Sequence, residues 1–264
     1  MGVVNVTPDS FSDGGEFASV ERAVAHAERL AEAGADVVDI GGESTRPGSD
    51  GVSEDTELAR VVPVIIEVRR RCPELMISVD TSKLDVARVA VEAGATMIND
   101  VTAGGAPGMF ELAARRDVAL VLMHMRGQPR SMQQDTSYGD VVEEVRSYLA
   151  ERAHAAEAAG VAPENIMLDP GIGFGKSVEG NLELLRSLPR LADLGYPLLV
   201  GTSRKSFLGL LTGAPVSERL GATLASLVPA LSLERAILRV HDVLEVVRFR
   251  TVWEALQAKA AVER

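Results

Sequence analysis

The sequence predicts an α/β fold, a single (β/α)8 TIM barrel with its active site at the carboxyl ends of the strands, and two observations support this. Eight short apolar segments rich in β-branched residues alternate with longer stretches of helical pattern, which is typical of parallel strands joined by crossover helices. Most of these strands lack an alternation of apolar and polar residues, which indicates burial on both faces. Because the eight units fill the chain, we expect one domain, residues 1–264.

The individual elements follow from runs of Val, Ile and Leu and from helical spacing of apolar residues. The expected strands are residues 2–6, 36–40, 76–79, 96–98, 119–123, 166–168, 197–200 and 236–240. The expected helices are residues 20–33, 54–71, 84–93, 109–115, 141–159, 182–194, 216–231 and 244–260. Gly34, Gly94 and Gly160 each follow a predicted helix, where glycine readily adopts the left-handed conformation that ends it.

Polar and ionisable residues follow almost every predicted strand at its carboxyl end. In a barrel these ends meet at one rim, where the active sites of such enzymes lie. An open sheet would spread them along an edge, with a crevice served by only a few strands, so contributions from all eight strands favour a closed barrel. The residues concerned are Asn5, Asp39, Asp80, Asn99, Asp100, His124, Asp169, the run 202–206, Arg239 and His241.

The composition argues against several classes of partner. Lys and Arg number 27 against 38 Asp and Glu, a formal charge of −11, and an acidic surface repels nucleic-acid backbones and anionic lipids. No apolar run approaches the ~20 residues that a membrane helix needs, and no signal peptide is apparent. Cys72 is the single cysteine, so no intramolecular disulfide can form. We expect a cytoplasmic protein that binds neither nucleic acid nor a membrane.

The strand ends suggest two kinds of ligand chemistry. Asp80, Asn99 and Asp169 offer several acceptors and an amide donor, which suits a neutral heterocycle, although the same residues could instead hold Mg²⁺. The cations of the run 202–206 and Arg239 follow strands seven and eight, where barrels often bind phosphate. We find no zinc-site pattern, P-loop, Ser-His-Asp order or dinucleotide fingerprint.

The motifs of the chain, taken in order from residue 2 to about residue 250, resemble those of dihydropteroate synthases. They are NVTPDSFSDGG (5–15), DIGGESTRPG (39–48), SVDTSK (78–83), NDV (99–101), LMHMRG (122–127), DPGIGFGK (169–176), TSRKSFLG (202–209) and RVHDV (239–243). The resemblance implies a transferase of folate biosynthesis that joins 6-hydroxymethyl-7,8-dihydropterin diphosphate to 4-aminobenzoate. The products would be 7,8-dihydropteroate and diphosphate, formed by a Mg²⁺-assisted dissociative substitution. It also implies a homodimer and sensitivity to sulfonamides.

The resemblance further assigns roles to the matching positions. Catalysis would involve Asp80, as the group stabilising a pterin cation, together with Lys205 and Arg46. Pterin binding would involve Asp80, Asn99, Met123, Asp169, Phe174 and Lys205. The diphosphate region would comprise Asn5, Thr45, Arg46, Arg239 and His241, with Asn5 helping to hold the metal. The aminobenzoate site would comprise Phe11, Arg46, Pro47, Phe174, Lys205 and Ser206.

Two other functions remain open at this point. A pterin-dependent methyltransferase domain would share Asp80, Asn99 and Asp169, but it would not need the cations after strands seven and eight, because its substrate carries no diphosphate. A non-catalytic homologue would bind a pterin without turning it over. The intact residues Arg46 and Lys205 argue against that second alternative.

Overall fold

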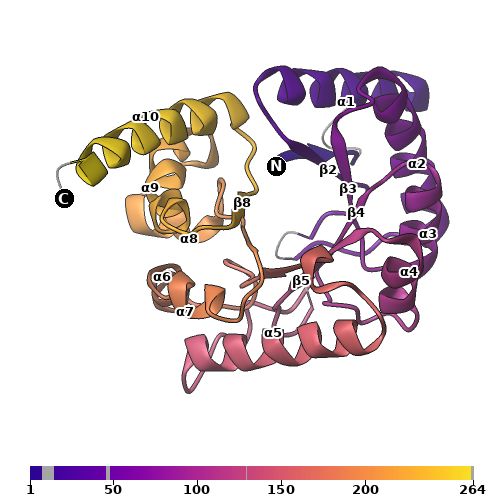
Figure 1. Ribbon diagram of the computed structural model, residues 1–264. Coiled ribbons are helices and arrows are strands. Elements are labelled where there is room, and N and C mark those ends of the chain that lie inside the picture. The colour runs from indigo at the N-terminus through magenta and orange to yellow at the C-terminus, as the bar shows by residue number, and fades with distance from the viewer. Residues whose placement is uncertain (8–14, 46–47, 129, 263–264) are drawn as a thin grey trace.

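The computed structural model describes residues 1–7, 15–45, 48–128 and 130–262. Within these ranges, eight parallel strands pair in chain order from β1 to β8, and helices surround them (Figure 1). A parallel bridge joins Gly2 in β1 to Val240 just after β8. The Val3 amide donates to the Val240 carbonyl (3.2 Å), and the Val240 amide donates to the Met1 carbonyl (3.0 Å). The sheet therefore curls into a TIM-like barrel, as the sequence predicts.

The strands agree with the predicted positions to within two residues at each end. They are β1 Gly2–Asn5, β2 Val37–Gly41, β3 Met76–Asp80, β4 Met97–Asp100, β5 Ala119–Met123, β6 Ile166–Asp169, β7 Leu198–Val200 and β8 Ala236–Leu238. The helices are α1 Gly15–Glu32, α2 Glu54–Arg71, α3 Leu84–Glu92, α4 Met109–Arg116, α5 Val141–Ala158, α6 Val178–Arg186, α7 Leu188–Ala192, α8 Ser206–Thr212, α9 Leu220–Leu231 and α10 Val243–Val262. Among the described helices, none is both long and apolar enough to cross a membrane.

Three helical predictions differ from the structure. The expected helix 20–33 begins five residues earlier, since α1 starts at Gly15. The expected helix 182–194 is interrupted at Ser187, and Pro189, which has no N–H to donate, then lies in the first turn of α7. The expected helix 216–231 starts as a 3-10 turn, Val216–Glu218, before α9 begins. Helix α8 was not predicted, because its seven residues are too few for a periodic pattern to be recognised.

The core has two parts, and the smaller one positions the polar side chains. The larger cluster fills the space between strands and helices and includes Val38, Ile98 and Leu120. The smaller cluster is formed by Met1, Val37, Met97, Val121, Met167 and Leu199. Because side chains alternate along a strand, residues two positions later point to the same side as this inner cluster. The sequence places Asp39, Asn99, Met123, Asp169 and Gly201 at those positions.

Candidate active site

Four polar residues from or just after four different strands form one hydrogen-bonded group, which we call the arginine cluster: Asp39, Asp80, Asn99 and Arg239. The Arg239 guanidinium donates from Nε to Asp39 Oδ2 (2.6 Å) and from Nη2 to Asp80 Oδ2 (2.9 Å). The Asn99 amide donates to the same Asp39 oxygen (3.0 Å). Asp39, Asp80 and Asn99 are all buried. Side chains far apart in sequence thus meet at the carboxyl ends of β2, β3 and β4 and just after β8.

The charges in this cluster shift one another's pKa values. Burial, and next the negative charge of Asp39, raise the pKa of Asp80 to about 7, although Arg239 opposes the change. Burial by itself would lower the pKa of Arg239, but the carboxylates of Asp39 and Asp80 raise it above its usual value. Arg239 therefore stays a cation, and Asp80 has a pKa near the pH at which enzymes commonly work.

A second group lies at the ends of β6 and β7 and contains Asp169, Phe174 and Lys205. Lys205 immediately precedes α8, and its Nζ lies 4.5 Å from the centre of the Phe174 ring and donates to the Ile172 carbonyl. Burial lowers the pKa of Lys205 to about 8, and Asp169 opposes this. Burial raises the pKa of Asp169, and Lys205 is the largest opposing influence. A cation, an aromatic ring and a carboxyl group therefore lie together beside the arginine cluster.

The glycines of the loop after β6 allow that loop to pack tightly against the loop after β5. Gly171, Gly173 and Gly175 all have positive φ angles. A Cβ atom at Gly171 would lie only 1.9 Å from the carbonyl oxygen of His124, so a larger residue cannot occupy this position without movement of the backbone. The glycines of this loop are therefore required by the local backbone conformation and by the close approach of the two loops.

Lys176 holds this loop from within the protein. Its Nζ lies 2.9 Å from the carbonyl oxygens of both Gly171 and Phe174, and 3.0 Å from Nδ1 of His124. Burial lowers the pKa of Lys176 to about 7. The contact with the Phe174 carbonyl fixes the backbone that carries the ring beside Lys205. The sequence did not predict a role for Lys176, because nothing in the neighbouring residues indicates that its amine is buried.

Replacing Lys176 with Met is expected to reduce the free energy of unfolding by about 2–4 kcal/mol, because several buried acceptors lose their donor. Urea denaturation followed by circular dichroism measures the change. The matched control is Arg186→Met, which removes an exposed cation at the end of α6 and should change the stability by less than about 0.5 kcal/mol. Equal stability of Lys176→Met and the unmodified protein would show that the amine does not hold the loop.

The remaining predicted residues lie at or near the same strand ends. Asn5 ends β1 and Met123 ends β5, while Ser206 is the exposed first residue of α8. His241 Nδ1 lies 3.0 Å from the Ser203 hydroxyl, and Thr45 is half-buried in the segment after β2. Three further predicted residues lie outside the described residues, namely Phe11, Arg46 and Pro47.

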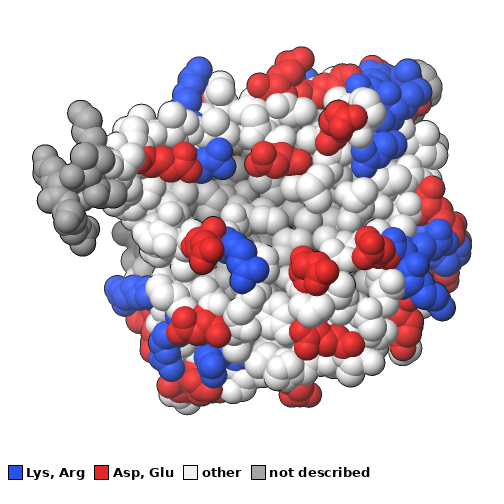
Figure 2. All heavy atoms as spheres, in the orientation of Figure 1, with Lys and Arg blue, Asp and Glu red and all other residues white. Residues whose placement is uncertain are grey.

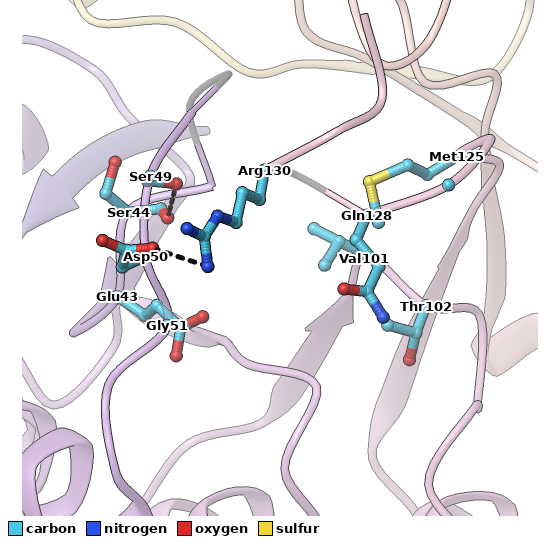
Figure 3. A pocket seen from close by; sticks show the side chains of 11 residues that line it. Glu43, Ser44, Ser49, Asp50, Gly51, Val101, Thr102, Met125, Gln128 and Arg130 are labelled. Atoms are coloured by element: carbon cyan, nitrogen blue, oxygen red, sulfur yellow. Dashed lines mark hydrogen bonds and ion pairs between the residues drawn. The ribbon is translucent and has the colours of Figure 1, made fainter. Parts of the chain in front are cut away.

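A cavity of about 410 Å³ opens between the segments that follow β2, β4 and β5 (Figure 3). Ser44 and Asp50 lie on one side of it, and Met125 and Gln128 lie on the other. Arg130 reaches across toward Asp50, with 3.6 Å between guanidinium nitrogen and carboxylate oxygen. The volume is in the range of small-molecule sites. None of the predicted site residues within the described ranges lines this cavity, although it borders the strand ends that carry them.

Charged side chains of both signs are interleaved on the face of the molecule drawn in Figure 2. Ion pairs between neighbouring helices include Arg71 with Glu21 (2.7 Å) and Arg116 with Glu92 (2.6 Å). The described residues contain no group of three or more His, Cys, Asp or Glu side chains arranged to hold a metal ion.

Comparison with known proteins identifies the class to which this barrel and its polar strand ends belong. Residues 1–241 match the family model described as pterin binding enzyme. The chain is 48% identical to the dihydropteroate synthase of Escherichia coli over 260 residues, which cover 98% of this chain and 92% of that one. The chain belongs to the pterin-binding enzymes and, within them, to the dihydropteroate synthase family.

Solved structures give the same result. The dihydropteroate synthase of Xanthomonas albilineans with 4-aminobenzoic acid superposes with a TM-score of 0.91 at 50% identity, covering 98% of this chain and 92% of that one. The same enzyme in complex with 7,8-dihydropteroate has a TM-score of 0.88 at 48% identity, with 98% and 93% covered. These relatives support a dihydropteroate synthase and not the methyltransferase alternative.

Proposed function

We propose that this chain joins 6-hydroxymethyl-7,8-dihydropterin diphosphate to 4-aminobenzoate and releases 7,8-dihydropteroate and diphosphate. The observation that carries the proposal is the meeting of Asp80, Asn99 and Arg239 at the carboxyl ends of the barrel strands. The family membership adds the substrate class. We place the active site at this rim, with the reacting pterin beside the arginine cluster.

The pterin ring suits the polar groups at the strand ends. A pterin presents ring N–H and amino donors together with ring nitrogen and carbonyl acceptors. Carboxyl groups at Asp80 and Asp169 would accept from the donors, and the Asn99 amide oxygen would accept a further one. Met123, buried at the end of β5, and Phe174 supply apolar contact for the ring faces. This arrangement would fix the orientation of the pterin.

The proposed reaction breaks one bond and forms another at the same carbon atom. The bond between the pterin methylene carbon and the diphosphate oxygen breaks, and the electron pair leaves with diphosphate. The amine nitrogen of 4-aminobenzoate then forms a bond to that carbon and releases a proton. Positive charge develops on the pterin between the two events. The fixed carboxylate of Asp80 would stabilise this charge in a site that water enters poorly.

Mg²⁺ is an expected partner of the diphosphate. Asn5 fits this role as one ligand, because Mg²⁺ commonly takes only one or two protein oxygens and completes its shell with substrate phosphates and water. The ion would neutralise part of the charge on the departing diphosphate. Thr45, Arg46 and His241 are the further candidates for binding the phosphate oxygens.

Arg239 serves both parts of the proposed site. Its Nε and Nη2 atoms donate to carboxylates within the protein, so Nη1 remains for a phosphate oxygen. For the aminobenzoate we propose contacts with Phe174, in the loop after β6, and with Lys205 and Ser206, at the start of α8. Phe11, Arg46 and Pro47 complete this proposed set.

A direct test is to mix the purified protein with the pterin diphosphate, 4-aminobenzoate and Mg²⁺ and to measure diphosphate release. We expect release that requires both organic substrates and falls when EDTA removes Mg²⁺. Release without 4-aminobenzoate at the full rate would indicate simple hydrolysis. An absence of release, with the pterin diphosphate still bound in calorimetry, would favour the non-catalytic homologue.

Sulfonamides are expected to inhibit the reaction in competition with 4-aminobenzoate, because both carry an aromatic amine and would contact Lys205 and Ser206. Initial rates at several 4-aminobenzoate concentrations give the pattern of inhibition. An inhibitor constant independent of the 4-aminobenzoate concentration would place the drug outside the proposed aminobenzoate site.

We further propose that residues 1–264 act as one domain in a cytoplasmic homodimer. Exposed apolar side chains on and just after α8, at Leu210, Leu211 and Val216, offer a surface suited to a second copy of the chain. A single cysteine agrees with a reducing compartment. Light scattering at micromolar concentration would give the mass of a dimer, or of a monomer if this proposal is wrong.

A further inference from the structure

Asp39 is the most buried member of the arginine cluster, and its side chain contacts neighbouring side chains instead of solvent. It lies in the middle of β2, with no exposed surface, in register with Ser78 of β3. One of its oxygens, Oδ2, accepts from both Arg239 and Asn99. The burial of Asp39 separates it from any ligand that approaches from solvent. Asp39 can therefore affect a ligand only through the side chains around it.

Both bonds determine which atoms those side chains present. An amide whose nitrogen donates to a carboxylate keeps its oxygen as the acceptor, so the bond to Asp39 fixes which atom of Asn99 can accept from another group. A guanidinium held at Nε and Nη2 by two carboxylates is fixed in its plane, and among the described residues Nη1 has no such partner. Without Asp39 the amide of Asn99 could flip and the Arg239 side chain could rotate about its terminal bonds.

We propose that Asp39 is a positioning residue, which orients the Asn99 amide to accept from the pterin and orients the Arg239 guanidinium to contact the diphosphate. This inference rests on the proposed transferase function. It adds a residue that would touch neither substrate but would decide how two binding groups are presented.

Asp39 also acts on the charge of Asp80. The charged groups that influence Asp80 are Asp39 on β2, Arg239 after β8, Glu57 on α2 and Asp100 on β4. Among the charged groups, Asp39 raises the pKa of Asp80 most. Asp39 is also the ion-pair partner of Arg239, the cation that lowers this pKa. Replacing Asp39 by a neutral group should therefore lower the pKa of Asp80. The acid limb of the pH–rate profile, which reflects ionisation of Asp80, should move to lower pH.

The experiment compares Asp39→Asn with Asp39→Glu in steady-state kinetics across pH 5 to 9. Asp39→Asn keeps the shape but loses the charge, so we expect kcat/KM for the pterin diphosphate to fall by about 10²-fold, with an acid limb at lower pH. Asp39→Glu keeps the charge but shifts the oxygens by one methylene, so the fall should be similar while the acid limb stays near pH 7. The second variant also provides a test if the first does not fold.

Glu57→Gln is the matched control, because it also neutralises a buried carboxylate, one that pairs with Lys83 and not with Arg239. At pH 8, where Asp80 is ionised in both proteins, its kcat/KM should stay within about threefold of the unmodified enzyme, even if stability falls. Glu57 also raises the pKa of Asp80, but less than Asp39 does, so the acid limb should move less than in Asp39→Asn. Equal kinetic losses in Glu57→Gln and Asp39→Asn would overturn the proposal, since general destabilisation would then explain both. Unchanged kinetics in both Asp39 variants would also overturn it. An unmodified protein without turnover would instead refute the proposed function.

Discussion

Asp80→Asn should lower kcat by about 10²–10³-fold while the dissociation constant of the pterin diphosphate changes by less than about threefold. The carboxamide keeps the size of the side chain and an acceptor for the pterin, so ground-state binding is largely kept. The negative charge matters most when positive charge develops on the pterin, and removing it costs transition-state stabilisation. Rapid-quench kinetics and calorimetric titration measure the two quantities separately. Equal losses in kcat and in affinity would contradict the proposed role in stabilising the cation.

The unmodified enzyme should lose activity as the pH falls through about 7, because burial and Asp39 raise the pKa of Asp80 to about that value. Stability should change in the opposite direction. A raised carboxyl pKa favours the folded state fully below the unfolded pKa, and this contribution is lost as the pH rises through about 7. Asp80→Asn should therefore gain stability relative to the unmodified protein as the pH rises from 5 to 8. An unchanged stability difference over that range would contradict the raised pKa.

Arg239→Ala is expected to destabilise the fold and to weaken substrate binding together. Removal of the guanidinium leaves Asp39 and Asp80 as buried carboxylates without their cation, which costs about 3–5 kcal/mol of unfolding free energy. The diphosphate-bearing substrate should also bind more weakly, whereas a pterin without diphosphate should lose less. Urea denaturation and calorimetric titration with both ligands measure these effects.

The control is Arg204→Ala, because Arg204 pairs with Asp242 at a more exposed position. An exposed pair of this kind contributes about 1 kcal/mol or less. If Arg239→Ala were no more destabilising than Arg204→Ala, the arginine cluster would not be the buried charge centre described above. If affinity for the diphosphate were unchanged, Arg239 would have no part in the anion site.

The sequence was sufficient to predict the barrel and the strand ends at which the candidate residues lie. Most strands are buried runs with a polar residue at or just after their carboxyl end, and this pattern placed Asp80, Asn99, Asp169 and Arg239 at one end of the sheet. The alternation of side chains along each strand explains why they then point inward. The structure confirms the eight parallel strands, while the roles of these residues in binding and catalysis remain predictions.

Hydrogen bonds between side chains far apart in the sequence could not be predicted from the sequence. The bond between Arg239 and Asp39 spans 200 positions and depends on closure of the barrel. The same holds for Lys176, whose amine is buried by a loop whose path is set by three glycines with positive φ. Arg239 was predicted as an anion ligand alone, because its carboxylate partners lie on strands that closure brings beside it.

A crystal structure of the protein with 7,8-dihydropteroate is the most direct test of the central claim, that one small molecule is held by residues from several strand ends. We predict the pterin ring within hydrogen-bonding distance of Asp80, Asn99 and Asp169, with Lys205 near the bond between the two halves of the product. A product bound in the cavity between Asp50 and Gln128, with none of those residues in contact, would contradict the account.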